Sequence, residues 1–379
     1  MKILFTGGGT GGHFYPLIAV AEAIRDVAKE KKLIEPSLYY AAPEPYDKEA
    51  LFANSITFVK TSAGKRRPYF SILNFFDLFK TAWGVLTAML QIFFIYPDVV
   101  FSKGGYASFP ALFAARFFRI PVVIHESDTI PGKANIWASK FAARIAISYA
   151  QAAAGFPESV QANVALTGNP VRKAILNPAR EGAHEFLGLE ETAPVIFVTG
   201  GSQGAQAIND VVLKALPQLL EKYQVIHQTG KNNFTEVEQL ASVIIGTSAY
   251  KARFHPFAEL NELAMRMAYG AADLVITRAG SSLFEVASAG IPAIVIPIPK
   301  AITEHQTPNA IAYSKTGAGI VIEQNNLSAT LLVSEVSRIL DNKDLHARMQ
   351  LAARAAGHDN AAKIIADELL NIALSHESK

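Results

Sequence analysis

The chain contains no cysteine among its 379 residues, and only 18% of its residues are charged. The first absence excludes disulfide bonds, thiolate nucleophiles and cysteine metal sites. The formal net charge of +2 does not single out a nucleic acid, so we predict no nucleic-acid partner. The sequence also has no HxxxH pair and no carboxylate cluster that demands a metal ion. We therefore expect neither a metal nor another bound cofactor.

Two kinds of long hydrophobic run are also missing. The chain turns glycine-rich at Gly7, whereas the apolar part of a signal peptide runs for roughly 7–15 residues. The most apolar stretch, residues 65–98, is interrupted by Asp77 and Lys80. Its charge-free run Thr81–Tyr96 is shorter than the ~20 residues of a spanning helix. We expect neither an export signal nor a good transmembrane segment.

The same apolar stretch has two interpretations along its length. For Thr81–Ile95 the pattern favours a buried helix of the first domain. In Tyr69–Phe79, aromatic residues recur near helical spacing behind the basic triplet KRR at 65–67. Aromatic residues beside cations suit the interface of an anionic bilayer. We therefore predict that the region Lys65–Phe79 contacts an anionic membrane surface.

The sequence contains the same predicted order of strands, glycine turns and helices twice. "ILFTGGGTGGHFYPLIAVAEAI" at 3–24 and "PVIFVTGGSQGAQAINDVVLKAL" at 194–216 each read as strand, glycine turn and helix. Residues 98–126 and 273–299 each read as strand, basic residue, glycine turn, helix, Ile-Pro and strand. Strands that alternate with helices predict parallel sheets. The fold class is therefore α/β, with two Rossmann-like doubly wound domains that face an interdomain cleft.

The length and composition also predict where the domains meet. A chain this long exceeds a typical single core. We place the first domain at 1–175 and the second at 193–356. The segment 176–192 is polar, contains "NPAREG" and reads as a linker. A last helix at 357–379 closes the chain, and packing back on the first domain is one option for it.

The first glycine turn has several possible uses. Gly7, Gly9 and Gly12 satisfy the dinucleotide fingerprint, which alone is weak evidence. A turn needed only for its backbone geometry is the alternative. Thr10 and His13 argue against a nicotinamide site, because a redox cofactor needs close packing there. Since the second domain has its own turn, "GGSQGA", the phosphate site could lie on either half.

Several polar residues fit a nucleotide diphosphate. The turns at 201–204 and 280–282 each open a helix, whose free N–H groups suit phosphate. Glu285 can accept two ribose hydroxyls, or it is a solvated first-turn glutamate. Arg172 can meet a phosphate charge, although surface arginines are common. Gln306 and Asn309 follow a strand end and have no evident core role.

His13 is the best candidate for a general base, because the ordinary pKa of histidine lies near neutrality. A lone histidine is more often structural, but this one stands at the exit of a glycine turn. His125, Glu126 and Asp128 end another strand of the same domain, so we expect them to line the same cleft.

With these residues identified, the chain resembles the MurG family of UDP-N-acetylglucosamine transferases over essentially its whole length. The resemblance rests on "GGGTGGHFYP", "SKGGYASFP", "IHESDTIPGKAN", "TGNPVR", "TGGSQGA", "RAGSSLFE" and "HQTPNA", which occur in this order. It implies a GT-B fold and an inverting transfer to the 4-hydroxyl of MurNAc in an undecaprenyl-diphosphate-linked MurNAc-pentapeptide. The implied donor is UDP-GlcNAc, and the implied location is the cytoplasmic face of the cell membrane, as a peripheral protein.

The resemblance also implies roles for individual residues. His13 stands beside the reacting hydroxyl, and Tyr106 lies on the acceptor side as a further catalytic candidate. Apart from the resemblance, Glu126 is the next catalytic candidate after His13. The implied substrate-binding residues are Thr10, Gly11, Gly12, Asp128, Asn135, Arg172, Ser202, Gln203, Gly204, Ala258, Ser281, Ser282, Glu285, Gln306 and Asn309. The helix N-termini at "GGSQGA" and "RAGSS" would offset charge on the departing UDP.

Three alternatives remain from the sequence. Another GT-B enzyme, such as a glycolipid synthase or a UDP-GlcNAc 2-epimerase, shares the expected fold, although an epimerase has no use for the Lys65–Phe79 region. A non-catalytic nucleotide-binding protein needs no base such as His13. An NAD-dependent oxidoreductase predicts a single fingerprint, which fits the doubled turns less well.

Overall fold

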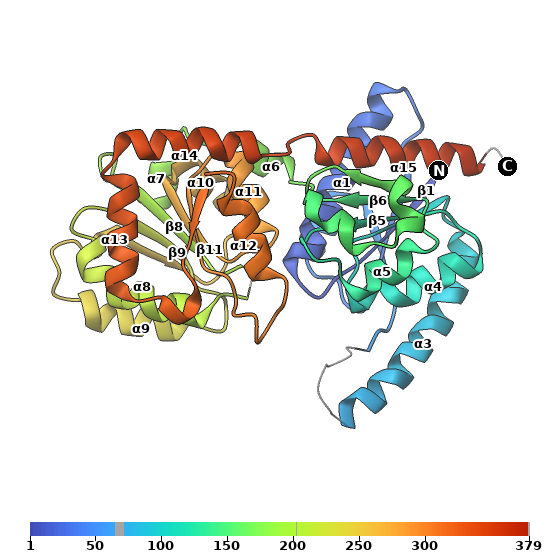
Figure 1. Ribbon diagram of the computed structural model, residues 1–379, viewed down its shortest axis with the longest axis horizontal. Helices are drawn as coiled ribbons and strands as arrows, with labels where there is room; N and C mark the ends of the chain where they lie inside the picture. Colours follow the sequence, from blue (N-terminus) through green and yellow to red (C-terminus); the bar gives the residue numbers. More distant parts are fainter. Residues whose placement is uncertain (65–71, 202, 378–379) are drawn as a thin grey trace. The chain divides into compact units, whose positions relative to one another are not determined.

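The computed structural model describes residues 1–64, 72–201 and 203–377. The chain forms two compact units, one of Met1–Arg172 with His358–Lys379 and one of Lys173–Gly357 (Figure 1). Each unit contains one parallel sheet. The predicted α/β architecture of two parallel sheets is confirmed. The N-terminal segment of the first unit ends at Arg172, whereas we predicted that the first domain ends at residue 175.

The first sheet has seven strands in the order β3-β2-β1-β4-β5-β6-β7. Its strands are β1 (Lys2–Thr6), β2 (Ser37–Ala42), β3 (Ile56–Lys60), β4 (Val99–Ser102), β5 (Val122–Glu126), β6 (Arg144–Ile147) and β7 (Val164–Leu166). In β1, Ile3 and Phe5 enter one core and Leu4 enters the other. A central strand buried on both faces must be apolar throughout, which is why β1 reads as a continuous hydrophobic run.

Helices cover both faces of this sheet. They are α1 (Gly11–Glu30), α2 (Lys48–Ala53), α3 (Ile72–Ile95), α4 (Phe109–Phe117), α5 (Lys133–Ser139) and α15 (Ala361–Glu377), with the 3-10 turns η1 (Tyr106–Ser108), η2 (Ala150–Gly155) and η3 (Glu158–Asn163). Because every strand pair is parallel, the carboxyl ends of β1, β4 and β5 meet at one edge of the sheet. That edge carries the glycine turns.

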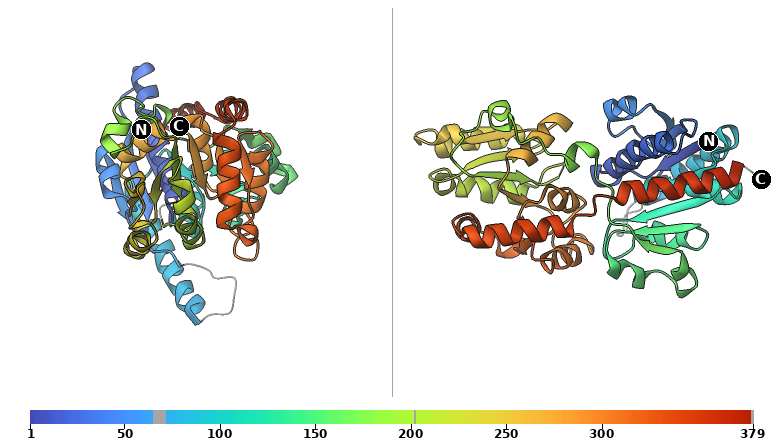
Figure 2. Two further views of the ribbon diagram at one scale, coloured as in Figure 1. Left: turned by 90° about the vertical axis from the view of Figure 1, so that its left-hand side faces the viewer. Right: turned by 90° about the horizontal axis from the view of Figure 1, so that it is seen from above.

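The C-terminal helix α15 belongs to the first unit and packs along α1 (Figure 2, right). Its buried face includes Ala366, Leu369 and Leu370, which join the same core as α1. Ion pairs fasten its exposed side, and one of them joins Lys31 Nζ to Asp367 Oδ1 at 2.9 Å. The helix therefore closes one face of the first sheet although it is last in the sequence.

Helix α3 departs from its expected burial. We predicted that Thr81–Ile95 is a buried helix, and this was wrong, because only 17% of the window Asp77–Ile95 is buried. Figure 1 shows α3 extending beyond the rest of its unit. Within the described residues this window is long and apolar enough to cross a membrane, judged by length and composition alone.

One side of α3 nevertheless belongs to the domain core. Ala88 and Ile92 are buried with residues of α4 and the sheet. The other side exposes Trp83, Leu86 and Leu90, each more than half accessible. The sequence misled us because a helix that is apolar on all sides is typical of both a buried core helix and a membrane-facing one.

The second sheet has six strands in the order β10-β9-β8-β11-β12-β13. Its strands are β8 (Val195–Thr199), β9 (Gln224–Gln228), β10 (Phe254–Phe257), β11 (Leu274–Thr277), β12 (Ala293–Val295) and β13 (Gly319–Val321). Its helices are α6 (Lys173–Leu176), α7 (Ala183–Leu187), α8 (Gln206–Leu219), α9 (Phe234–Ile245), α10 (Glu262–Ala271), α11 (Ser282–Ala289), α12 (Gln306–Ser314), α13 (Ala329–Leu340) and α14 (Lys343–Ala356), with the 3-10 turns η4 (Lys251–Arg253) and η5 (Gln324–Asn326).

The segment that we interpreted as a linker contains structure of its own. Helix α7 lies within it and packs on α10 of the second unit. Ala183 and Leu187 of α7 are buried. Gly182 and Gly188 bound the helix in left-handed conformations, which glycine adopts at little cost. The polar composition of the segment hid this short buried contact.

A buried histidine in the second core gives a testable dependence of stability on pH. His227 is fully buried beside Asn209 Oδ1, 3.0 Å from its Nε2, and burial lowers its pKa from 6.5 to about 3. Between these values the unfolded chain binds the extra proton, so stability falls as the pH falls. We expect His227 to cost about 2 kcal/mol of unfolding free energy at pH 5 relative to pH 8.

Urea denaturation at both pH values, for the wild-type protein and for His227→Gln, measures this effect. The variant keeps an N–H donor for Asn209 but does not titrate, so its loss of stability on acidification should be smaller by that amount. Equal losses in the two proteins would show that His227 does not act in this way.

Candidate active site

The glycine turn after β1 lies directly against the turn after β4. Gly9 has φ of +99°, and a Cβ there would lie 3.2 Å from Tyr106 Cε1. The hydroxyl of Tyr40 donates to the carbonyl oxygen of Gly7 at 2.7 Å. Bare backbone is therefore required here for two physical reasons, the left-handed conformation and the close approach of an aromatic ring.

His13 lies in the first turn of α1, where it contacts both glycine turns. Its Nδ1 is 3.2 Å from Thr10 Oγ1, and a Cβ on Gly105 would lie 3.8 Å from its Cε1. Burial and, to a smaller extent, the charge of Lys103 lower the pKa of His13 from 6.5 to about 4, against the opposing effect of Asp128. At neutral pH the imidazole is therefore uncharged and able to accept a proton.

Glu126 ends β5 and holds the loop that follows it. Its carboxylate accepts the backbone N–H of Asp128 at 3.0 Å, the N–H of Gly132 at 2.9 Å and Asn135 Nδ2 at 2.8 Å. Burial raises the pKa of Glu126, and the neighbouring Asp128 raises it further. With three N–H donors, this carboxylate anchors the loop, a contact pattern that the sequence did not predict.

This anchoring predicts a stability effect for Glu126→Gln. The amide group must turn its own N–H donors toward at least one of the three N–H groups, which leaves a buried donor unpaired. We expect the free energy of unfolding to fall by about 1–3 kcal/mol. Chemical denaturation measures the difference, with the exposed Glu158→Gln as the matched control. Equal stabilities of Glu126→Gln and wild type would contradict the anchoring role.

Lys103 is the residue of this region that sequence reasoning missed. It is 2% exposed, and its Nζ lies 2.6 Å from His125 Nδ1, 2.6 Å from Ser127 Oγ and 3.0 Å from Asn169 Oδ1. The signal was available, because the repeated pattern places a basic residue after the strand in both halves. Its counterpart in the second unit, Arg278, is also buried.

The remaining predicted residues of the first unit are close to this group or packed on α1. Asn135 is buried, donates to the carbonyl of His125 and faces Gly104, a Cβ on which would lie 2.7 Å from its Oδ1. Arg172 is buried with its guanidinium 4.0 Å from the centre of the Tyr15 ring. Gly11 and Gly12 begin α1 behind Thr10.

In the second unit, the turn after β8 approaches the end of β9. Gly204 has φ of +75°, and a Cβ there would lie 1.9 Å from the carbonyl oxygen of Thr229. Gln203 beside it is exposed, and α8 begins at Gln206. Ser202, a predicted ligand, lies outside the described residues. The close backbone contact holds the start of α8 at the carboxyl end of the sheet.

The turn after β11 contains the next predicted group. Ser281 precedes α11 and Ser282 begins it, with Ser282 Oγ 3.2 Å from Thr277 Oγ1. Glu285, one turn into α11, accepts the hydroxyl of Tyr269 at 3.2 Å and is only partly buried. Ala258 directly follows β10 and is also partly buried.

The two amides of α12 have structural partners, contrary to our expectation that neither has a core role. Gln306 Oε1 accepts the backbone N–H of Ile298 at 3.0 Å. Asn309 is 1% exposed and donates to the carbonyl of Ala279 at 3.1 Å. Both contacts fasten the start of α12 to loops at the carboxyl ends of β11 and β12, beside the turn that carries Ser281.

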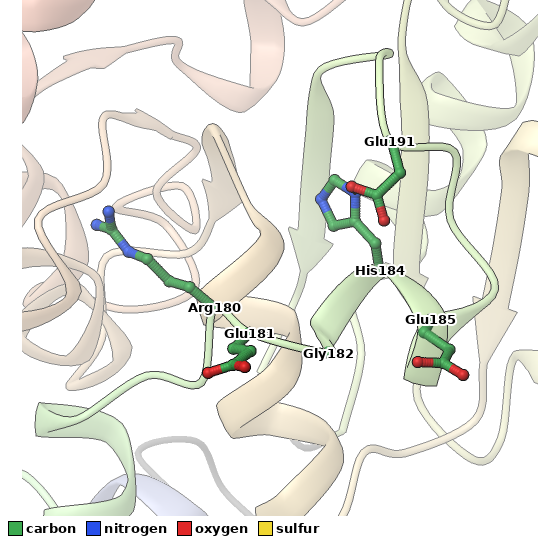
Figure 3. A pocket seen from close by; sticks show the side chains of 6 residues that line it. All are labelled: Arg180, Glu181, Gly182, His184, Glu185 and Glu191. Atoms are coloured by element: carbon green, nitrogen blue, oxygen red, sulfur yellow. The ribbon is translucent and has the colours of Figure 1, made fainter.

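A separate cavity of about 330 Å³ lies on the second unit around α7 (Figure 3). It is lined by Arg180, Glu181, Gly182, His184, Glu185 and Glu191. None of these is a predicted site residue, and His184 lies 3.5 Å from Glu191 across it. Among the residues that the structure describes, no group of three or more His, Asp or Glu side chains could hold a metal ion.

The predicted residues thus form groups at the carboxyl ends of parallel strands, where ligands bind in doubly wound sheets. Two such sheets, each with glycine turns and helix N-termini at that edge, define the class as a GT-B type protein. Residues 3–147 match the glycosyltransferase family 28 N-terminal domain, and residues 195–366 match the family 28 C-terminal domain. The chain belongs to glycosyltransferase family 28, within its MurG group, and is a hexosyltransferase.

Individual relatives cover nearly all of the chain. A protein of Treponema denticola is 33% identical over 389 residues, covering 97% of this chain and 96% of its own length. One of Halothermothrix orenii is 36% identical over 360 residues, covering 93% of this chain and 94% of its own length. Both are named UDP-N-acetylglucosamine--N-acetylmuramyl-(pentapeptide) pyrophosphoryl-undecaprenol N-acetylglucosamine transferase.

Solved structures agree with this assignment. MurG of Acinetobacter baumannii is 26% identical with a TM-score of 0.69, covering 98% of this chain and 99% of its own. A UDP-GlcNAc 2-epimerase from Neisseria meningitidis has the same TM-score of 0.69 at 16% identity, covering 98% of this chain and 100% of its own. That second likeness shows the shared fold alone.

Proposed function

We propose that the chain transfers N-acetylglucosamine from UDP-GlcNAc to the 4-hydroxyl of MurNAc in an undecaprenyl-diphosphate-linked MurNAc-pentapeptide. This is the step of peptidoglycan synthesis that turns lipid I into lipid II. The names of relatives that are 33% and 36% identical over nearly the whole chain support it. The structural observation that carries it is the position of His13 between two glycine turns. The imidazole, a proton acceptor, lies there beside backbone that has no side chains.

The reaction is a single displacement that inverts the anomeric carbon. The acceptor oxygen forms a bond to C1 of the sugar, the bond from C1 to the phosphate oxygen breaks, and UDP leaves with the electron pair. His13 takes the proton of the hydroxyl. His13 Nδ1 lies 3.2 Å from Thr10 Oγ1. In this proposal Nδ1–H donates to that hydroxyl oxygen, which leaves the lone pair on Nε2 to accept the proton.

The second unit binds the nucleotide in this proposal. The helix N-termini of α8 and α11 present free N–H groups at the carboxyl edge of the sheet, and these offset the charge that develops on UDP. Glu285 accepts the ribose hydroxyls from the first turn of α11. Gln306 and Asn309 hold the adjoining loops in place, so their role is to keep the turn before α11 in its binding conformation.

The first unit binds the lipid-linked acceptor and rests on the cytoplasmic face of the membrane through α3. The exposed side of α3 repeats large apolar residues at helical spacing, among them Trp83, Leu86 and Leu90. Ala88 and Ile92 on its other side are packed into the domain core, which favours docking in the plane of the bilayer. Residues 65–71 of the predicted basic and aromatic region lie outside the described part of the chain, and Leu78 and Phe79 at its end are exposed.

Product analysis with radiolabelled UDP-GlcNAc tests this function. With the lipid-linked MurNAc-peptide in vesicles, label should pass to the lipid as a β-1,4 disaccharide, in equal amount to the UDP released. Label in free GlcNAc or in a 2-epimer, with none in the lipid, would replace the transferase with a hydrolase or an epimerase.

A further inference from the structure

Lys103 joins three segments at the carboxyl edge of the first sheet. It directly follows β4, and its backbone N–H donates to the carbonyl of Thr6 at 3.0 Å, at the end of β1. Its side chain reaches His125 and Ser127 at the end of β5, and Asn169 beyond β7. A Cβ on Gly7 would lie 3.1 Å from Lys103 Cβ, so the lysine also packs under the first glycine turn.

The protonation of this cluster follows from its hydrogen bonds. His125 Nε2 lies 2.9 Å from the carbonyl oxygen of Gly168, which can only accept, so the proton of the neutral imidazole is on Nε2. Nδ1 then accepts, and Lys103 Nζ must donate to it. Ser127 Oγ and Asn169 Oδ1 take the other two N–H groups. The three donors of an ammonium group are therefore all used.

The ammonium group is also placed beside the residues of the proposed chemistry. Gly104 and Gly105 separate it from Tyr106, whose ring lies against Gly9. Glu126 and Ser127 separate His125 from Asp128 in the chain. The charged and titratable groups around Lys103 are His13 on α1, and His125, Glu126 and Asp128 at the end of β5.

We propose that Lys103 is a positioning residue, whose ammonium group ties the turn that carries Tyr106 to the loop that carries Asp128 and so holds the acceptor half of the site in shape. This inference rests on the proposed function only in placing the acceptor at these turns. Lys103 has no contact of its own with substrate, because protein acceptors occupy its three donors.

The hydrogen bonds of the Lys103 ammonium group depend on pH in a defined direction. Burial lowers the pKa of Lys103 to about 7, while Glu126 and Asp128 act in the opposite direction. The ammonium form is present below this pKa and is lost as the pH rises through it. A neutral amine has two N–H donors and cannot serve all three acceptors. Turnover should therefore fall on the alkaline side, above about pH 7.

The test compares wild type, Lys103→Met and Ser127→Ala in the transfer assay. Lys103→Met keeps an unbranched apolar side chain without the donors, and we expect turnover to fall about 100-fold through misplacement of the site. The KM for UDP-GlcNAc should stay unchanged, since the proposed donor ligands are on the second unit. The alkaline decline should disappear in this variant. The exposed Lys140→Met is the matched control and should behave as wild type.

Ser127→Ala keeps the test decisive even if Lys103→Met does not fold. It removes one acceptor of the ammonium group, so the alkaline decline should move to lower pH. Full turnover in Lys103→Met, or an alkaline decline that persists in it, would overturn the inference. An alkaline decline of turnover at the same pH in Ser127→Ala as in wild type would also overturn the inference.

A measurement without substrate separates this inference from the proposed function. In NMR spectra of lysine-labelled protein, one side chain should titrate near pH 7, far below the ordinary lysine value of about 10.4. Its signal should be missing in Lys103→Met, or shifted in Ser127→Ala. If that lysine is seen but wild type transfers no sugar, the proposed function fails and the tie stands. If no lysine titrates there, the predicted alkaline loss of these hydrogen bonds is wrong, and full turnover in Lys103→Met is then the result that overturns the positioning role.

Discussion

His13→Ala should lower turnover by about 100- to 10,000-fold, the usual contribution of a positioned proton acceptor. Its affinity for UDP should stay close to that of wild type. The physical reason is that His13 lies on α1 of the first unit, whereas the proposed nucleotide ligands are on α8 and α11 of the second. Steady-state transfer kinetics and UDP calorimetry on the same preparation measure both quantities.

The control for this result is His184→Ala, which removes a histidine of the second unit near Glu191 and should leave turnover unchanged. A His13→Ala protein that binds UDP weakly but turns over at the normal rate would disprove the base assignment. Asp128 would then be the next candidate, because the carboxylate of Glu126 is occupied by three N–H donors.

The second large effect concerns α3. The double variant Leu86→Glu with Leu90→Glu removes two side chains that are 54% and 58% exposed on one helix face. Each buried leucine is worth roughly 2 kcal/mol on transfer to an apolar phase. We therefore expect partition into anionic vesicles to fall about 1,000-fold, and transfer to the vesicle-borne acceptor to fall with it. Vesicle sedimentation measures the partition.

An equally exposed leucine elsewhere supplies the control. Leu351 on α14 is 69% exposed, and Leu351→Glu should leave partition unchanged because it lies on the second unit. The double variant should still transfer sugar at the wild-type rate to a short-chain, water-soluble acceptor. Unchanged vesicle binding in the double variant would exclude this face of α3 as the membrane contact.

The sheets and the positions of the glycine turns could be predicted from the sequence, because these depend on local patterns. A strand buried on both faces has a continuous apolar run, and a turn with positive φ and close contacts accepts only glycine. Gly9 and Gly204 are such positions. The position of His13 in the first turn of α1 follows from the same pattern.

The environment of each side chain could not be predicted, because it depends on segments far apart in the chain. Glu126 was a catalytic candidate until its three loop donors were known. The amides of Gln306 and Asn309 found partners on other loops. The exposure of α3 depends on which side of one apolar helix packs against α4, and composition does not specify that.

For Lys103, the sequence shows the position of the residue but not its contacts. Its position was visible in the repeated pattern of strand, basic residue and glycine turn, and Arg278 occupies the matching place in the second unit. Arg278 is also buried, and its guanidinium donates to the carbonyl of Ile296 at 3.0 Å and to Gln324 Oε1 at 2.8 Å. Only the folded structure shows that both cations bind protein groups.

Hydrogen exchange in the presence of UDP tests most directly the assignment of the nucleotide to the second unit. We predict slower exchange at the amides that open α8 and α11, around residues 204–207 and 280–284, with no change at residues 7–13. Protection confined to residues 7–13 would place the nucleotide on the first unit and contradict this assignment.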